Sequence, residues 1–281
     1  MARIVAVHGI AQQVKGGESL KTVWLPALRD GLKLAGARRI EDDELVCAFY
    51  GDLFRKKGTR SAAIPPLTAD DVTSDDEKEL LQLWWEAAAR VDRTVPGPDA
   101  KTRARTPQAV QRALNNLSKV SFFAGLAEKV MIWDLKQVIA YLNDPDMRAK
   151  IRTRVTELLT PDTEVVIGHS LGSVVAYEAL CASANARVKT FVTVGSPLGI
   201  SNVVFGKLDP KPVNGVGVWP RVELWYNVAD KGDVVALEKQ LAPFFGKKVR
   251  DRAVDNGVQA HDVLPYLTSV ETGKAVASGL T

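Results

Sequence analysis

The sequence is poor in residues that bind metals or cross-link chains. It has two cysteines and three histidines in 281 residues, and none of them has the spacing of a metal-ligand motif. Cys47 lies in an apolar, strand-like run and Cys181 in a helix-like run. Isolated cysteines in such runs are typical of small buried side chains. We therefore expect no disulfide, no metal site and no cofactor.

Long hydrophobic runs and an excess of one charge are also absent. The apolar segment near the start, Ile4–Val7, is too short for the core of a secretion signal, and no later run approaches the roughly 20 apolar residues of a membrane span. The 37 basic and 33 acidic residues leave a net charge of +4, which is too small to indicate a nucleic-acid partner. The sequence predicts a cytoplasmic protein with a small-molecule partner and says nothing about its oligomeric state.

What the sequence does contain is an alternation of strand-like and helix-like segments. Short β-branched runs occur at residues 4–7, 45–50, 164–167, 188–194, 222–228 and, more weakly, 249–254. Apolar residues between them recur at helical spacing, as at Trp24, Leu28 and Leu32, or at 147–158 after a predicted N-cap at Asp144. This alternation predicts an α/β fold with a mostly parallel central sheet flanked by helices on both faces.

The alternation stops between about residues 52 and 142. No strand-like run appears there, and two proline-rich breaks, at 65–66 and 96–98, separate helix-like segments. We interpret this stretch as a helical insertion within a single domain that spans residues 1–281. We expect most of its apolar residues to pack against the main domain and a few to line a pocket. They include Leu80, Leu81, Leu83, Trp84, Trp85, Phe122, Phe123, Leu126, Val130 and Trp133.

A Gly-x-Ser-x-Gly motif occupies residues 168–172. A buried-looking strand leads into it and a helix-like segment follows, which is the strand-turn-helix context in which this motif presents a nucleophile. Ser170 is then expected at the tip of a tight turn with strained backbone angles, between Gly168 and Gly172, where side chains would collide. The N-terminus of the following helix would stabilise negative charge on an attacked carbonyl oxygen.

Three segments together make the chain similar to the α/β-hydrolases. Gly-His-Ser-Leu-Gly at 168–172 is the lipase and esterase form of the motif, Val-Ala-Val-His-Gly-Ile at 5–10 is a strand ending in His-Gly, and Gly-Ser-Pro-Leu-Gly at 195–199 is similar to a segment beside lipase active sites. The resemblance implies an α/β-hydrolase fold that begins at its usual third strand. It also implies an oxyanion hole built from the backbone N–H groups of Leu171 and of Ile10, which follows Gly9.

A serine nucleophile needs a base, and histidine is the side chain best suited to that task near neutral pH. His8 ends the first strand and is better explained as a structural residue. His169 is adjacent to Ser170 and must point away from it. His261 remains, in a loop that enters the last helix-like segment, where the resembling family keeps its base. The alternative, a surface histidine that caps this helix, is disfavoured by elimination.

The base in turn needs an acid, and the family order is serine, acid, histidine. The acid should therefore follow the strand-like run at 222–228, where Asp230 and Asp233 are both available. Asp233 resembles the family's Asp-Pro-Val pattern, with Val234 in place of proline, and is our first choice. Asp230 is the alternative. We expect the aspartate that is not the acid to form a turn.

Together these residues predict a serine hydrolase that cleaves carboxylic esters, including lipid-like ones, through an acyl-enzyme on Ser170. Thioesterases, lactonases, amidases and acyltransferases use the same machinery. A hypothesis from another class is a scaffold that binds a ligand without turnover. The complete set of catalytic residues argues against the scaffold. A buried aspartate and a strained serine both destabilise a fold, so a protein without catalytic activity has little structural reason to keep them.

Overall fold

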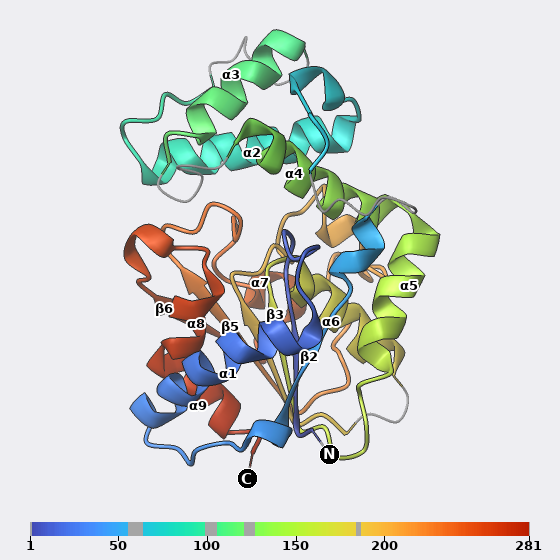
Figure 1. The fold of residues 1–281 in the computed structure, drawn as a ribbon, viewed down its shortest axis with the longest axis vertical. Coiled ribbons are helices and arrows are strands. Elements are labelled where there is room, and N and C mark those ends of the chain that lie inside the picture. The colour runs from blue at the N-terminus through green and yellow to red at the C-terminus, as the bar shows by residue number, and fades with distance from the viewer. Residues whose placement is uncertain (1, 56–63, 99–105, 121–126, 184–186, 281) are drawn as a thin grey trace.

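The computed structural model describes residues 2–55, 64–98, 106–120, 127–183 and 187–280. It shows an α/β architecture in which helices cover both faces of a six-stranded, all-parallel sheet (Figure 1). The strands are β1 (Ile4–Val7), β2 (Leu45–Ala48), β3 (Val165–His169), β4 (Thr190–Val194), β5 (Leu224–Asp230) and β6 (Val249–Val254). Each of the six strand-like runs overlaps one of these strands, although β3 and β5 extend two residues beyond their predicted runs. The predicted parallel sheet is confirmed.

The strand order reverses its direction between two neighbouring strands, β1 and β3. The order is β2-β1-β3-β4-β5-β6. After β1 the chain adds β2 at one edge of the sheet, then crosses to the other side of β1 and adds β3 to β6 in sequence towards the opposite edge. At such a reversal the loops after the two central strands diverge and leave a crevice at the carboxyl ends of the strands, where α/β proteins bind ligands. Here the two loops follow β1 and β3.

One face of the sheet is covered by α1 (Gly17–Leu34), α8 (Val263–Thr268) and α9 (Val270–Ala277). The apolar stripe predicted on α1 is buried, since Trp24, Leu28 and Leu32 are at most 3% exposed. The helices pack almost backbone to backbone, because a Cβ added at Gly31 would lie 2.1 Å from the carbonyl oxygen of Leu267. This packing holds the C-terminal segment that follows His261 against the sheet.

The other face is covered by α6 (Leu171–Ala182), α5 (Pro145–Thr156) and the end of α4 (Glu128–Asn143). Asp144 caps α5 as predicted, because its side chain accepts hydrogen bonds from the N–H groups of Asp146 and Met147, both at 3.0 Å. These helices meet at Glu178, a fully buried carboxylate on α6. It accepts hydrogen bonds from Tyr141 Oη (2.6 Å) and from the N–H of Asp209 (3.1 Å). It also accepts two from Arg148, from Nε (2.8 Å) and from Nη2.

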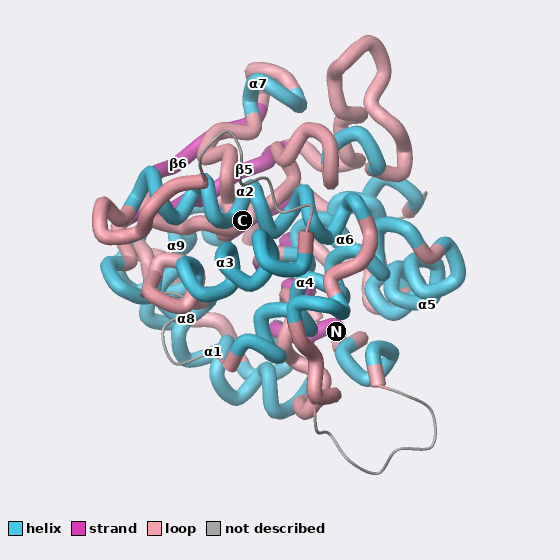
Figure 2. The backbone as a smooth tube through the Cα atoms, turned by 90° about the horizontal axis from the view of Figure 1, so that it is seen from above, coloured by secondary structure: helices cyan, strands magenta, loops and turns pink. Residues whose placement is uncertain are grey.

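The insertion forms a layer over the carboxyl ends of the strands. Viewed from the side and from above, α2 (Asp75–Val91), α3 (Pro107–Leu117) and the start of α4 lie across this end of the sheet (Figures 1 and 2). The described residues between 52 and 142 hold helices, turns and loops but no strand. Of the apolar residues predicted to pack in this region, Phe122, Phe123 and Leu126 lie outside the described residues.

Shorter elements complete the chain: α7 (Ala242–Phe245) and 3-10 turns at Asp42–Glu44, Gly51–Phe54, Ala69–Asp71, Phe205–Lys207 and Gly257–Gln259. Both cysteines are free thiols, Cys47 in β2 and Cys181 in α6, so no disulfide links them. Among the helices described, none combines the length and the apolar character that a membrane crossing needs.

Candidate active site

Ser170 stands at the turn between β3 and α6 with strained backbone angles. Its φ of 52° and ψ of −130° lie outside the regions that residues with side chains usually adopt. A Cβ at Gly168 would lie 2.5 Å from Ser173 Cα, as expected for so tight a turn. A Cβ at Gly172 would lie 2.2 Å from the carbonyl oxygen of His8. The second glycine is therefore required by the end of β1, and not only by the turn itself.

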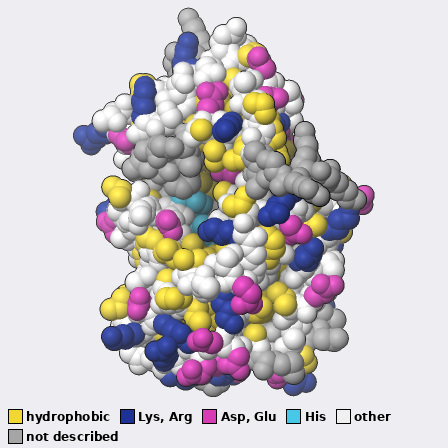
Figure 3. Space-filling model, in the orientation of Figure 1, with side chains coloured by type: hydrophobic (Ala, Val, Ile, Leu, Met, Phe, Trp, Pro, Cys, Tyr) yellow, Lys and Arg dark blue, Asp and Glu magenta, His cyan; other side chains and the backbone are white. Residues whose placement is uncertain are grey.

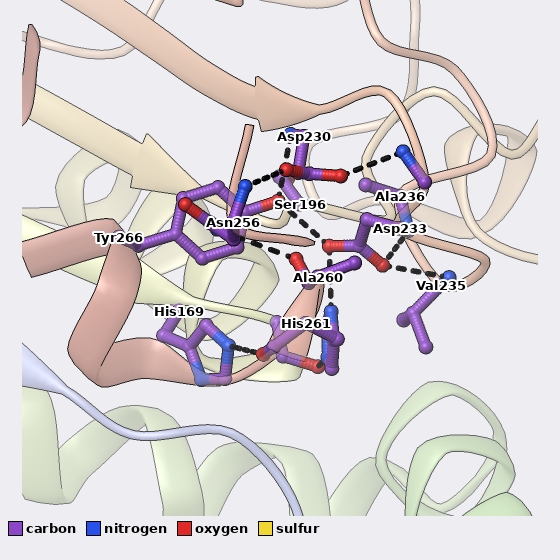
Figure 4. Close-up of polar contacts among 12 residues, drawn as sticks. His169, Ser196, Asp230, Asp233, Val235, Ala236, Asn256, Ala260, His261 and Tyr266 are labelled. Carbon is purple, nitrogen blue, oxygen red and sulfur yellow. Dashed lines mark hydrogen bonds and ion pairs between the residues drawn. The ribbon is translucent and has the colours of Figure 1, made fainter. Parts of the chain in front are cut away.

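Three predicted residues from separate loops come together here. His261 Nε2 is 3.0 Å from Ser170 Oγ, and His261 Nδ1 is 2.7 Å from Asp233 Oδ2. Ser170, His261 and Asp233 are 3%, 5% and 1% exposed, so the chain of hydrogen bonds is shielded from bulk water. Figure 4 shows His261 directed at the Asp233 carboxylate. This geometry lets Ser170 donate its proton to His261 while the opposite nitrogen is held by Asp233.

The Asp233 carboxylate has a hydrogen-bond partner for each of its oxygen lone pairs. Oδ1 accepts from the N–H groups of Val235 (2.9 Å) and Ala236 (3.1 Å), and Oδ2 accepts from His261 and from Tyr266 Oη (2.8 Å). Burial alone would raise the pKa of Asp233, but His261, the nearby Lys239 and the backbone donors outweigh burial and lower the pKa to about 2. An ionised Asp233 fixes the proton of the neutral imidazole on Nδ1 and leaves Nε2 free to accept from Ser170.

Asp230, the alternative acid, is equally buried, and both of its carboxylate oxygens accept from backbone N–H groups. Its Oδ1 accepts from the N–H of Gly232 at 2.6 Å, a turn of the kind expected for the aspartate that is not the acid. Its Oδ2 accepts from the N–H of Asn256, five residues before His261. Asp230 therefore joins the loop after β5 to the loop that carries the histidine (Figure 4).

Tyr266 is a site residue that the sequence does not reveal. Its hydroxyl accepts from the N–H of Asp230 at 2.8 Å and donates to Asp233 Oδ2 at 2.8 Å. Burial, followed by the charge of Asp233, raises the pKa of Tyr266 far above its ordinary value, so the phenol remains a donor. The tyrosine lies in an apolar helical run, where its spacing only predicts a core residue.

His169 also has a role that its position next to Ser170 did not suggest. Its Nε2 lies 2.8 Å from the carbonyl oxygen of His261, and the two rings are 4.9 Å apart. Burial lowers the pKa of His169 to about 3, so the ring is neutral and donates its single proton to that carbonyl. His169 therefore anchors the main chain of the candidate base.

The loop after β1 lies on the other side of Ser170. His8 Nδ1 donates to the carbonyl oxygen of Gly9 at 2.6 Å, and His8 Nε2 accepts from the N–H of Tyr50 at 3.2 Å. Desolvation lowers the pKa of His8 to about 4, which keeps this neutral tautomer. A Cβ at Gly9 would lie 2.8 Å from Ser170 Cβ, so only glycine lets this loop approach the nucleophile.

The two backbone N–H groups predicted from the sequence to form an oxyanion hole belong to Leu171 and Ile10. Leu171 is the first residue of α6, so its N–H has no carbonyl partner within the helix. Among the described residues, none accepts a hydrogen bond from the N–H of Ile10. Ala11, the next residue, has a φ of 61°, an uncommon value for a residue with a side chain. Backbone strain thus occurs in both turns, at Ser170 after β3 and at Ala11 after β1.

The Gly-Ser-Pro-Leu-Gly segment, residues 195–199, packs against Asp233 and His261. Gly195 has a φ of 57°, and a Cβ there would lie 2.9 Å from Asp233 Oδ2 and 3.2 Å from His261 Nδ1. Ser196 Oγ is 2.7 Å from Ser173 Oγ, which in turn donates to the carbonyl oxygen of Ser170 at 2.6 Å. The segment therefore supports both the nucleophile turn and the hydrogen bond behind it.

A small apolar pocket, which we call the Ser170 pocket, opens beside the nucleophile. The main domain contributes Ser170 together with Ile10, Leu171, Pro197, Ile200, Val204 and Val235. The insertion contributes Leu80 and Trp84 from α2 and Val138 from α4, so part of the insertion does more than pack against the main domain. Histidine surface is visible in a hollow below the insertion (Figure 3).

Within the described segments, no group of three or more His, Cys, Asp or Glu side chains is placed to hold a metal ion. Comparisons of the chain with protein-family models, with curated proteins and with solved structures gave no match. The site is therefore interpreted from its own geometry.

Proposed function

We propose that this protein is a serine hydrolase of the α/β-hydrolase type that cleaves carboxylic esters through an acyl-enzyme on Ser170. The observation that carries the proposal is the buried chain of hydrogen bonds from Ser170 through His261 to Asp233. A histidine between a serine hydroxyl and an ionised carboxylate is the arrangement that makes serine nucleophilic.

The reaction proceeds in two halves. Ser170 Oγ attacks the ester carbonyl carbon while His261 Nε2 takes the hydroxyl proton, and Asp233 stabilises the resulting imidazolium. The N–H groups of Leu171 and Ile10 hold the oxyanion. His261 then gives its proton to the departing alcohol, which leaves an ester on Ser170. Water, deprotonated by His261, attacks this ester, and the proton returns to Ser170 as the acid leaves.

The position of each residue in the fold supports the assignment to this family. The nucleophile follows β3, the acid follows β5 and the base follows β6, which is the family's chain order along a sheet that begins at the usual third strand. The insertion departs from the family, because it follows β2 rather than occupying the usual lid position. Substrate preference is therefore argued from this chain alone.

A fluorophosphonate tests the mechanism without knowledge of the substrate, because it reacts with an activated serine. We expect intact-mass analysis to show one adduct, mapped to Ser170 and absent from Ser170→Ala. His261→Ala should react at least about 100-fold more slowly, since the hydroxyl then lacks its base. No adduct under conditions that label a reference serine hydrolase would reject the proposal in favour of a non-catalytic scaffold.

A further inference from the structure

The wall of the Ser170 pocket opposite the main domain consists of the insertion's apolar side chains. Leu80 and Trp84 on α2 and Val138 on α4 line it, and they are only 1%, 2% and 6% exposed. Apart from Ser170, every lining residue that the structure describes is aliphatic, proline or tryptophan. The pocket therefore suits an uncharged, apolar group attached to the carbon that Ser170 attacks.

The lining also indicates which half of an ester enters the pocket. Ser170 and both residues of the proposed oxyanion hole, Ile10 and Leu171, border the pocket, so the ester carbonyl lies at its mouth. The leaving oxygen has to reach His261 Nε2 to receive a proton, and His261 does not border the pocket. The alcohol half therefore lies on the histidine side, and the acyl substituent points into the pocket.

The pocket is very small. The centre of a water-sized sphere can occupy only about 10 Å³ of it, so a short alkyl group fits, whereas a long chain would have to displace packed side chains. From these observations we propose that the protein is a short-chain esterase, in which Leu80 and Trp84 limit the length of the acyl group. This proposal rests on the hydrolase function proposed above.

The wall is tied to the main domain by polar contacts along α2. Glu79 accepts a hydrogen bond from Asn202 Nδ2 at 2.9 Å, and Asp76 pairs with Lys207. Glu77 also pairs with Lys136 of α4 at 2.9 Å. Both Asn202 and Lys207 belong to the segment after β4 that also contributes Ile200 and Val204 to the pocket. The two sides of the pocket are thus joined, which favours a fixed wall over one that opens for long chains.

The experiment compares kcat/KM for p-nitrophenyl acetate, butyrate and octanoate. For the wild type we expect acetate to exceed octanoate by at least about 100-fold, since one methylene alone can change specificity by 10-fold or more. Leu80→Ala and Trp84→Ala should each lower this ratio at least about tenfold by gaining activity on octanoate. Leu81→Ala is the matched control, because Leu81 is equally buried on α2 but does not line the pocket. Its ratio should equal that of the wild type.

Two failures are distinguishable. If a fluorophosphonate leaves Ser170 unmodified, the hydrolase function itself is wrong. If Ser170 is labelled but the wild type hydrolyses octanoate as well as acetate, or Leu81→Ala shifts the ratio as much as Leu80→Ala, only the length limit is wrong. If the protein rejects all aryl esters, or if a variant fails to fold, the wild type is instead labelled with methyl- and octyl-substituted fluorophosphonates. Equal labelling rates for these two reagents would overturn the proposal.

Discussion

The two sides of Ser170 are constructed in different ways. On the side of β5 and β6, Asp230, Asp233, His261 and Tyr266 are joined by hydrogen bonds whose lengths and directions allow little variation. On the side of the insertion, the pocket wall consists of apolar contacts, which tolerate changes of shape when volume is preserved. We expect changes on the polar side to reduce the rate on every substrate and changes on the apolar side to alter which substrate is preferred.

The largest effect should come from exchanging the acid on the polar side. Asp233→Asn keeps the shape but places an amide against His261 Nδ1, which can stabilise the wrong tautomer, so kcat should fall by roughly 10⁴. Asp230→Asn should lower kcat by far less. Because the buried Asp230 carboxylate accepts hydrogen bonds from two backbone N–H groups, this substitution should mainly reduce stability, by about 1–3 kcal/mol. Turnover of a short-chain aryl ester and urea unfolding measure the two effects.

A near-normal rate in Asp233→Asn beside a large loss in Asp230→Asn would show that the wrong aspartate had been assigned. Circular dichroism of both variants controls for folding. Equal losses of kcat in both would mean that the polar side acts as one unit rather than through a single acid.

The second effect is sensitivity to acid. The pKa values of His8 and His169 are lowered to about 4 and about 3 in the folded protein, while the unfolded chain binds these protons near pH 6.5. Below pH 6.5 the unfolded state therefore holds more protons than the folded state. As the pH is lowered, the free energy of unfolding decreases by about 1.4 kcal/mol per pH unit for each histidine. Asp233, with its pKa lowered to about 2, stabilises the fold above pH 4 and loses that contribution between about pH 4 and 2.

Urea unfolding between pH 7 and 4 measures this slope. His169→Gln lacks one of the two groups, so its stability should decline about half as steeply over the same range. A wild-type stability that stays constant from pH 7 to 5 would contradict the neutral state of both rings.

The smallest effect should come from Tyr266→Phe, which removes the hydroxyl between the two aspartates. We expect kcat to fall about tenfold with KM unchanged, because Asp233 loses one of the donors that orient it. Tyr177→Phe is a matched control: Tyr177 is also fully buried, and its hydroxyl donates to the carbonyl oxygen of Val218 at 2.7 Å. It should lose comparable stability with kcat intact, and an equal loss of kcat would assign Tyr266 a merely structural role.

The polar side could be predicted in part because its chemistry restricts the choice of residues. Ser170 followed from a motif in its strand-turn-helix context, and His261 followed from elimination among three histidines. The choice between Asp230 and Asp233 stayed open because both follow the same strand, and only three-dimensional distances show which carboxylate faces the imidazole. Tyr266 and His169 contact residues 33 and 92 positions away, and no local pattern reports such pairs.

The apolar side was harder to predict, for a physical reason. Leu80 and Leu81 are consecutive, equally buried and both part of one helical stripe, yet only Leu80 borders the Ser170 pocket. Periodicity identifies the face of a helix that is buried but not what it is buried against. The parallel sheet could be predicted, since strand-like runs alternate with helix-like segments. The docking of the insertion depends on contacts between segments distant in the chain.

Glu178 has a consequence for how the insertion can sit on the main domain. It lies about two helical turns beyond Ser170 on the same helix, and its charge is neutralised only where donors from α4, from α5 and from the segment after β4 converge. Apolar contacts permit sliding, whereas a shift of α4 that removed the Tyr141 hydroxyl would cost this buried carboxylate one of its hydrogen bonds. Glu178 thus fixes the orientation of the insertion above the nucleophile.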